Sequence, residues 1–463
     1  MKKIYALTMA LLILGTGCSD FDEDFSNNPN RPNLASGTQL IAQAQLYLPG
    51  LSSSPQGEFM AQYLAETQYL GISLYPQQST SFYSWYQGPL LDLETVLTTP
   101  EVVQGKDGPV NNQLAVAKIL KAYIYWNITD RWGDVPYSAA LQGEENFIPA
   151  YDAQQAIYQD LFLELKEAVD MIEPGGITND IMYDGDMDQW RKFANSIRLL
   201  MALRLSGIEP AMSQTEFTQA LADGVMESNG DNFVFRHLAE ENNQNYWYGQ
   251  IVNQNREWWA LTDGLVQEMK PYDDPRLPVY GNPSRDAGEY VGLVYGDEDS
   301  MGTEEFSLLG DAIFAQDAPV YLVTYAQILF AIAEAADKAW ISEDPKTYYD
   351  QAIENSIVQW TGTDEGVDDF LAQTEIAFDP STALEQIATQ RWIHLFMFGY
   401  EAWSEWRRTG FPDNFVLPKG VEVPTRLAYP DNEVFLNEAN YNDAVQRQFG
   451  GEDNIYGEVW WDQ

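Results

Sequence analysis

Long amphipathic helices narrow the choice of folds for this chain more than any other pattern in its sequence. Apolar residues recur at helical spacing in residues 112–127, where Leu114, Ala117, Leu120 and Ile124 fall on one face. The same period predicts helices over residues 152–172, 187–206, 320–340, 348–360 and 384–408. The helices arrive in pairs, with small residues available for close contacts. The sequence therefore predicts a mainly α fold of tetratricopeptide-like helix pairs, although no strict repeat is visible.

Segments rich in Gly, Asn, Tyr and Trp interrupt these helices. They cover residues 71–88, 233–259 and 280–317, and we interpret them as long functional loops with a few short strands. Hydrophobic residues make up 45% of the chain and aromatic residues 13%, which favours one large core. We therefore expect a single domain over residues 34–463 that carries the loops.

The N-terminus has the pattern of a bacterial export signal. Lys2 and Lys3 precede a short apolar run, and small residues lead to Cys18, the only cysteine of the chain. We predict a lipoprotein signal peptide over residues 1–17, lipidation of Cys18, and an acidic, proline-containing tether over residues 18–33. The apolar run is too short to span a bilayer, so a membrane would be contacted through the lipid anchor only. The alternative is a secreted protein with an incidental thiol.

The net charge of the chain limits its partners. There are 25 Lys and Arg against 70 Asp and Glu, a formal net charge of −45. Nucleic acids carry dense negative charge and are bound through clustered Lys and Arg, so we expect no nucleic-acid partner. A field of this sign also disfavours acidic polysaccharides and suits neutral ligands.

Binding residues are expected in the loops. A sugar ring offers C–H faces that stack on aromatic planes, and its hydroxyls bond to Asn, Gln, Asp or Glu. The string 242–248 supplies both kinds of residue, including three consecutive aromatic residues. Other rings, such as Trp258, Trp259 and Tyr86, are interpreted as anchors of the loops on the helical body. The predicted ligand-binding residues are Tyr75, Gln77, Tyr83, Trp85, Asn245, Tyr246, Trp247, Tyr248, Tyr290 and Tyr295.

Arginines within apolar helices require buried partners. Arg131 and Asp134 flank a Trp-Gly turn, and we predict that they pair and close it. For Arg198 and Arg204 the candidate partners are Asp186, Asp130 and Glu334, and Arg407 and Arg408 with Glu401 and Glu405 suggest a similar network. An anion-binding arginine cluster is the alternative.

The sequence offers little material for catalysis. Its two histidines, His237 and His394, leave little room for a triad or a His-based metal site, and His394 lies in an apolar helix. No G-x-S-x-G, phosphate-loop or H-E-x-x-H motif is present. We therefore expect no enzyme and no cofactor. A glycoside hydrolase remains an alternative, because its carboxylate pair needs no sequence motif. A structural calcium at residues 184–188 is a second open alternative.

Several strings occur in the order found in one protein family. They are NPN at 28–30, TDRWGDVPY at 129–137, YDGD at 183–186, WRKFANSIR at 190–198, DPR at 274–276, EAWSEWRRTG at 401–410 and RLAYPDNE at 426–433. Together they resemble the SusD/RagB-like outer-membrane lipoproteins, in the branch that begins with Asn-Pro-Asn.

The resemblance has consequences for fold, location and partner. It implies helix pairs with an irregular ligand-binding face, and a lipid-anchored protein exposed on the outer membrane. It also implies a neutral glycan ligand that is delivered to a SusC-type TonB-dependent transporter, without catalysis. A minority of members capture peptides or other nutrients, so a peptide-capturing subunit is the alternative function.

Overall fold

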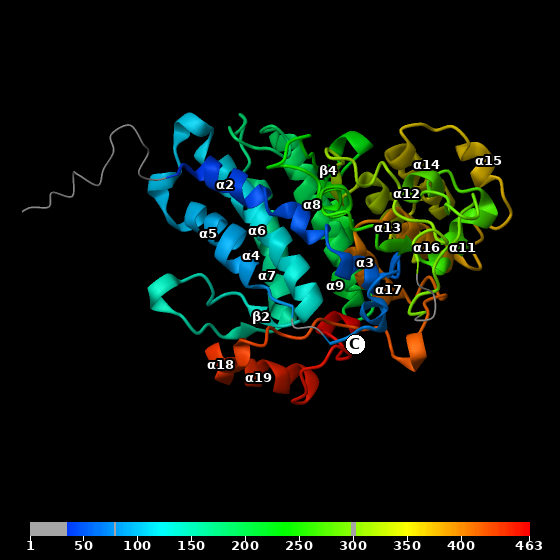
Figure 1. Cartoon of the computed structure of the whole chain (residues 1–463). Helices are drawn as coiled ribbons and strands as arrows, with labels where there is room; N and C mark the ends of the chain where they lie inside the picture. Colours follow the sequence, from blue (N-terminus) through cyan, green and yellow to red (C-terminus); the bar gives the residue numbers. More distant parts are fainter. Residues whose placement is uncertain (1–34, 78–79, 298–301) are drawn as a thin grey trace, which may run out of the picture.

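The computed structural model describes residues 35–77, 80–297 and 302–463 (Figure 1). The signal peptide, the lipidation at Cys18 and the tether predicted above lie outside the described residues. The helices are α2 (Gly37–Gln45), α3 (Pro55–Met60), α4 (Tyr83–Trp85), α5 (Leu91–Thr98), α6 (Val110–Trp132), α7 (Gln154–Met171), α8 (Met187–Arg204), α9 (Pro210–Asp223), α10 (Tyr246–Tyr248), α11 (Asp263–Met269), α12 (Leu277–Tyr280), α13 (Tyr325–Asp337), α14 (Pro345–Thr361), α15 (Val367–Leu371), α16 (Ala383–His394), α17 (Gly399–Thr409), α18 (Glu433–Leu436) and α19 (Glu438–Phe449).

The long helices pack in consecutive pairs, as the sequence predicts. α6 packs on α7, α8 on α9, α13 on α14, and α16 on α17. The pairs are joined in turn, because α7 contacts α8, α8 contacts α13, and α13 contacts α16. Figure 1 shows this series running from α6 and α7 across to α14 and α16. The prediction of a mainly α, tetratricopeptide-like fold is confirmed.

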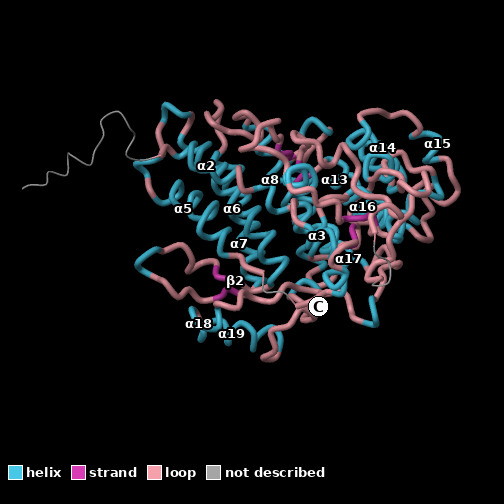
Figure 2. The backbone as a smooth tube through the Cα atoms, viewed as in Figure 1, coloured by secondary structure: helices cyan, strands magenta, loops and turns pink. Residues whose placement is uncertain are grey.

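The strands are short and form three separate antiparallel pairs. Figure 2 shows them as brief magenta segments among helices and loops. The pairs are β1 (Leu64–Glu66) with β5 (Trp259–Leu261), β2 (Val135–Pro136) with β3 (Tyr151–Asp152), and β4 (Phe233–Phe235) with β6 (Val320–Val323). β1 with β5 and β4 with β6 join segments far apart in the sequence, whereas β2 and β3 flank one loop. β1 with β5 holds the segment after residue 66 beside Trp258.

Two predicted helices differ from the structure. The segment predicted as a helix over residues 320–340 begins as the strand β6 and becomes helical only at Tyr325. The helix predicted over residues 384–408 is broken between α16 and α17, where Met397 has a φ of 65°. Gly399 then lies against the backbone of α3, and a Cβ there would come within 2.2 Å of the Gly57 carbonyl oxygen. A side chain at position 399 would clash there, so this close approach of two backbones requires glycine.

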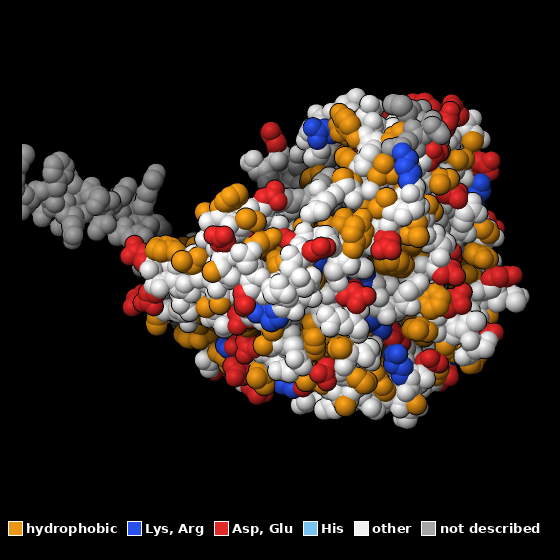
Figure 3. Space-filling model, turned by 90° about the horizontal axis from the view of Figure 1, so that it is seen from below, with side chains coloured by type: hydrophobic (Ala, Val, Ile, Leu, Met, Phe, Trp, Pro, Cys, Tyr) orange, Lys and Arg blue, Asp and Glu red, His pale blue; other side chains and the backbone are white. Residues whose placement is uncertain are grey.

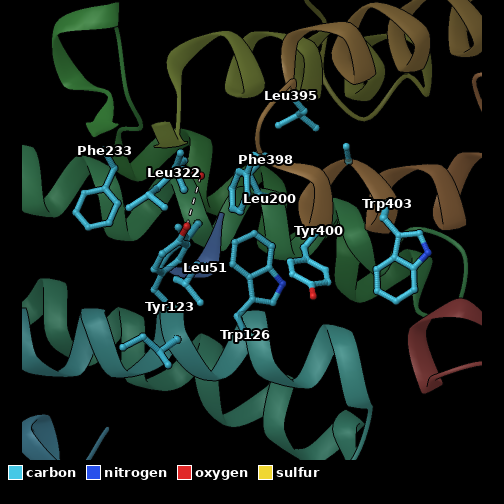
Figure 4. Close-up of a cluster of buried hydrophobic side chains, with 14 of the residues drawn as sticks. Leu51, Tyr123, Trp126, Leu200, Phe233, Leu322, Leu395, Phe398, Tyr400 and Trp403 are labelled. Carbon is cyan, nitrogen blue, oxygen red and sulfur yellow. Dashed lines mark hydrogen bonds between the residues drawn. The ribbon is translucent and has the colours of Figure 1, made fainter. Parts of the chain in front are cut away.

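The core is rich in large aromatic side chains. Figure 4 shows Tyr123 and Trp126 from α6 pointing into the same interior as Tyr400 and Trp403 from α17. The Tyr123 hydroxyl donates a hydrogen bond to the Leu322 carbonyl at 3.4 Å, which links α6 to β6. Rings of this size bury much apolar area and form one extended core, and a second, smaller cluster lies among α13, α14, α15 and α16.

A network of buried ion pairs joins four of these helices. Arg204 of α8 lies 2.7 Å from Glu401 and 3.3 Å from Glu405 of α17. Glu405 also lies 2.9 Å from Arg391 of α16 and 2.7 Å from Arg408, and Arg408 lies 2.6 Å from Glu334 of α13. Burial alone would raise the pKa of Glu405, but the surrounding guanidinium groups hold it well below its usual range.

The predicted partners of the other arginines are partly wrong. Arg131 does not pair with Asp134: its guanidinium donates to the Leu51 carbonyl and stacks 3.9 Å over the Tyr400 ring. Asp134 instead pairs with Arg447 of α19, a contact between distant segments that the local spacing could not show. Arg198 pairs with Asp223 at 2.9 Å, whereas Asp186 caps α8 by accepting from the backbone of residues 188 and 189.

The surface agrees with the acidic composition. On the face shown in Figure 3, Lys and Arg side chains lie singly among acidic and apolar ones rather than in a continuous patch. Within the described part of the chain, none of the helices combines the length and the apolar character needed to cross a membrane.

Removing one carboxylate from the network should cost much more than removing an exposed one. Glu405→Gln leaves Arg391 and Arg408 buried with fewer partners, and we expect a loss of about 3–5 kcal/mol of unfolding free energy. The matched control, Asp350→Asn, breaks an exposed pair with Lys346 and should cost about 0.3–0.5 kcal/mol. Urea unfolding measures both, and equal losses would contradict the assigned role of the network.

Stability should also depend on Glu58 of α3, which is fully buried. Burial raises the pKa of Glu58 to about 8, and the hydrogen bond from the Gly399 amide does not offset this. The folded state therefore keeps a proton that the unfolded state loses above its pKa of about 4.3. Between about pH 4.5 and 8, each pH unit should lower stability by about 1.4 kcal/mol. We expect Glu58→Gln to reduce this dependence of stability on pH, measured by urea titrations at several pH values. Glu354→Gln, at an exposed position of α14, should leave it unchanged.

Candidate ligand-binding site

Aromatic side chains gather where the loops meet the β1–β5 pair. The Thr67 amide and hydroxyl both contact the Trp258 carbonyl at 2.8 Å, which holds the two loop segments together. Tyr69 is 53% exposed and meets Trp258 edge to face, with ring centroids 5.0 Å apart. The Arg256 guanidinium lies 5.1 Å from the centre of the Trp258 ring. Burial raises the pKa of the half-buried Tyr246, and the Arg256 guanidinium partly offsets this rise.

We call Tyr69, Trp258, Arg256 and Tyr246 the aromatic row. The row places one exposed and two half-buried rings beside a single guanidinium. Aromatic faces of this kind suit the C–H faces of a sugar ring. No glycan-specific side chain is needed for such stacking, so the row defines the class of ligand rather than its identity.

The segment after Asn245 turns one aromatic ring inward and leaves its neighbours outside. Asn245 is buried: its side chain accepts a hydrogen bond from the Trp247 amide at 2.8 Å and donates to the Ala318 carbonyl at 3.1 Å. Trp247 is 3% exposed and packs edge to face on Trp259 at 5.1 Å. Tyr246 and Tyr248 are half-buried. Trp247 therefore lies between the aromatic row and the interior.

On its inner side, Trp247 lines a pocket of about 230 Å³, which we call the inner pocket. Trp360 forms another wall, where its indole N–H donates to the His394 carbonyl at 3.2 Å. The ring of Trp360 also meets Tyr321 edge to face at 5.4 Å. The lining consists of Ser53, Asn245, Trp247, Val279, Ala312, Ile313, Ala318, Pro319, Val320, Tyr321, Gln359, Trp360, Phe396 and Met397.

Two of the predicted binding residues are corrected by the structure. Tyr75 and Tyr295 are 4% and 2% exposed, and their rings lie 5.3 Å apart. The Tyr75 hydroxyl accepts a hydrogen bond from the Gln62 side chain at 2.8 Å. The two rings form a small cluster where their loops fold onto the core, and the protein therefore covers their faces. These rings cannot serve as a stacking surface.

The other predicted residues do not converge on one site. Asn245 and Trp247 are buried but line the inner pocket. Tyr83 is half-buried and donates its hydroxyl to Glu433 of α18, and Trp85 packs near Gly50. Gln77 is exposed and donates to the Asp453 carbonyl at 3.4 Å. Ligand binding by Gln77, Tyr83, Trp85, Tyr246, Tyr248 and Tyr290, which are not buried, stays a prediction.

Several residues of the site were missed by sequence reasoning. Tyr69 lies just before the segment 71–88 that we assigned as a binding loop. Tyr321, Gln359 and Trp360 lie in β6 and α14, where their apolar neighbours indicate core positions. The aromatic content of the loops was a usable signal for Tyr246, whereas Trp258, which we interpreted as an anchor of its loop, was not selected as a binding residue. A ring that points into a pocket from a helix has no such signal.

The described residues contain no grouped metal ligands. Among them, no three His, Cys, Asp or Glu side chains are grouped so that they could hold a metal ion. At the calcium candidate, Asp186 caps a helix and Asp188 pairs with Arg191 at 2.6 Å. His394 is buried between the hydroxyls of Thr324 and Ser356, and burial lowers its pKa to about 3. This histidine is a packed core residue, as predicted.

Paired helices that support an open aromatic face define a binding protein of the helical-repeat class. The family model described as starch-binding and associating with the outer membrane, SusD-like, matches residues 29–430. This chain belongs to the SusD-like family. Members of this family are binding proteins associated with the outer membrane.

Solved structures with the same fold cover nearly the whole chain. A structure described as a chitin-binding protein is 28% identical over 92% of this chain and 100% of its own, with a TM-score of 0.80. A SusD homologue from Bacteroides fragilis NCTC 9343 is 26% identical over 93% and 100%, with a TM-score of 0.80. An outer-membrane protein from Bacteroides vulgatus ATCC 8482, described as probably involved in nutrient binding, is 25% identical over 93% and 100%, with a TM-score of 0.82. No curated protein matches the chain.

Substitutions should separate buried rings from rings available to a ligand. Tyr75→Ala removes a buried ring, so we expect a loss of about 3–5 kcal/mol of unfolding free energy. Tyr69→Ala changes an exposed ring and should alter stability by about 0.5 kcal/mol or less. Urea unfolding of the two variants checks this, and similar losses for both would contradict the assigned exposures.

Proposed function

We propose that this protein captures neutral oligosaccharide or polysaccharide at the aromatic row and delivers it to a SusC-type TonB-dependent transporter. The observation that carries the proposal is the row itself, in which Tyr69 and Trp258 meet at 5.0 Å with Tyr69 largely exposed. The net charge of −45 supports an uncharged ligand. The similarity to a structure described as chitin-binding supports a glycan.

The proposal includes a place and a partner. Lipid chains on Cys18 would hold the protein on the cell surface, and the acidic tether would give it reach. Membership of a family that associates with the outer membrane supports a transporter partner there. The protein itself would be non-catalytic, so neutral sugars would bind to the aromatic row without any chemical reaction.

Stacking on the row is testable with a panel of neutral polysaccharides: β-glucan, α-glucan, fructan and chitin oligomers. In affinity electrophoresis or calorimetry we expect at least one of them to bind. Tyr69→Ala and Trp258→Ala should each weaken that binding by about 0.5–1.5 kcal/mol, because each removes one stacked ring. Phe435→Ala changes an 83% exposed ring of α18 and should leave binding unchanged.

Two results would overturn the proposal. If no neutral glycan bound while oligopeptides did, the protein would be a peptide-capturing subunit. If the purified protein released reducing ends from a glycan, the non-catalytic role would be wrong.

A further inference from the structure

The inner pocket is uncharged in a strongly acidic protein. None of its lining residues is an Asp, Glu, Lys or Arg, although the chain has a formal net charge of −45. An ionised ligand buried here would lack a charged partner among the residues that line the pocket, and this is costly. The pocket therefore favours an uncharged group.

The two amide side chains of the lining are not available to a ligand. Asn245 accepts a hydrogen bond from the Trp247 amide at 2.8 Å and donates to the Ala318 carbonyl at 3.1 Å. The Gln359 side-chain oxygen accepts from Asn232 at 3.1 Å, and its Nε2 is buried beyond the reach of a ligand. Two hydroxyl groups are the polar side-chain groups of the lining that remain.

The walls that a ligand can touch are apolar and partly aromatic. Trp360 and Tyr321 are half-buried, and their rings meet edge to face with centroids 5.4 Å apart. Tyr321 and Ser53 carry the two remaining hydroxyls. Met397 is also half-buried, and a methionine sulfur makes favourable contacts with aromatic rings. These side chains suit a flat, apolar guest.

The pocket has an open mouth and a closed back. Ala312 and Pro319 are exposed, so the pocket opens at the surface. Trp247 and Phe396 are 3% and 2% exposed, and they close the pocket toward the core. A ligand therefore enters from solvent and is surrounded on its other sides.

The aromatic wall is ordered before any ligand enters. The Trp360 indole N–H donates to the His394 carbonyl at 3.2 Å. Its ring also meets Tyr280 edge to face at 5.1 Å, in addition to Tyr321. Little conformational entropy is lost when a ligand packs against side chains that are already held in place.

We propose that the inner pocket is a second ligand site, distinct from the aromatic row, and that it binds one uncharged aromatic ring. The ring packs against Trp360 and Tyr321, and aromatic pairs gain stability beyond the burial of their area. An apolar cavity of about 150 Å³ is large enough for benzene, so the inner pocket, at about 230 Å³, has room for a substituted ring. The ring belongs either to a free aromatic molecule or to the aryl group of a glycoside.

This site differs in chemistry from the proposed glycan surface. A plain hexose presents hydroxyls on most of its edges, and the inner pocket would leave several of them without partners. The inference therefore goes beyond the proposed function and does not depend on it. The polysaccharide panel tests the aromatic row, whereas the ligands below test the inner pocket.

Two pairs of small ligands isolate the ring and its charge. Ligand-observed NMR titrations of the whole protein measure their dissociation constants. We expect benzyl alcohol to bind about tenfold or more tightly than benzoate, which has the same ring and an ionised group. For the aryl group of a glycoside, we expect phenyl β-glucoside to bind about tenfold or more tightly than methyl β-glucoside.

A substitution at the mouth assigns this binding to the pocket. Ala312→Trp places a large side chain at the exposed mouth and should abolish the preference for benzyl alcohol over benzoate. The control, Ala239→Trp, changes an exposed alanine outside the lining and should keep the preference.

The outcomes either support the inference or overturn it. Binding of benzyl alcohol without a preference for phenyl β-glucoside supports a site for free aromatic molecules. If neither ring-bearing neutral ligand binds more tightly than its partner, the inference is wrong, and this comparison needs no variant. If Tyr69→Ala removes the preference and Ala312→Trp does not, the ring stacks on the aromatic row and the inference is overturned. It is also overturned if a phenylalanine-containing oligopeptide binds in an Ala312→Trp-sensitive manner while benzyl alcohol does not bind.

Discussion

The buried pairing of arginine with glutamate is the interaction on which the rest of the structure depends. Glu405 of α17 lies within 3.3 Å of arginines from α8, α16 and α17 itself, and Arg408 extends the network to Glu334 of α13. A buried charge left without its partner is costly, so separating these helices would leave several charges unpaired. The network therefore couples the four helices to one another, while the aromatic core contributes much buried apolar area.

The site inherits its rigidity from this framework. Trp360 is fixed by the last carbonyl of α16, and α16 carries Arg391 of the network. Trp258 is fixed by the β1–β5 pair, which joins loops almost 200 residues apart. Irregular segments thus hold rings in defined orientations, so little conformational entropy would be lost in ordering these rings when a ligand binds. Trp247 separates the exposed aromatic row from the uncharged inner pocket, so two neighbouring surfaces of different chemistry share one short segment.

The comparison of sequence with structure shows where local patterns fail. Helical spacing predicted α6, α7 and α8 closely, although α6 and α8 are buried on most sides rather than on one face. It missed the break between α16 and α17, where Met397 has a positive φ and Gly399 lies against the backbone of Gly57 in α3. The predicted Arg131–Asp134 pair was wrong for the same reason: the partners of both residues, Leu51 and Arg447, lie in distant segments.

The amino-acid sequence by itself determined the fold class and the family, because helical period and ordered motifs are properties of the chain, and its net charge predicts an uncharged ligand. It also indicated that aromatic residues in the loops matter. Only the tertiary structure decided which rings are available: Tyr75 and Tyr295 cover each other, whereas Tyr69 stays exposed and Trp360 lines a pocket from within a helix. Exposure depends on what packs against a residue from far along the chain, and no local pattern carries that information.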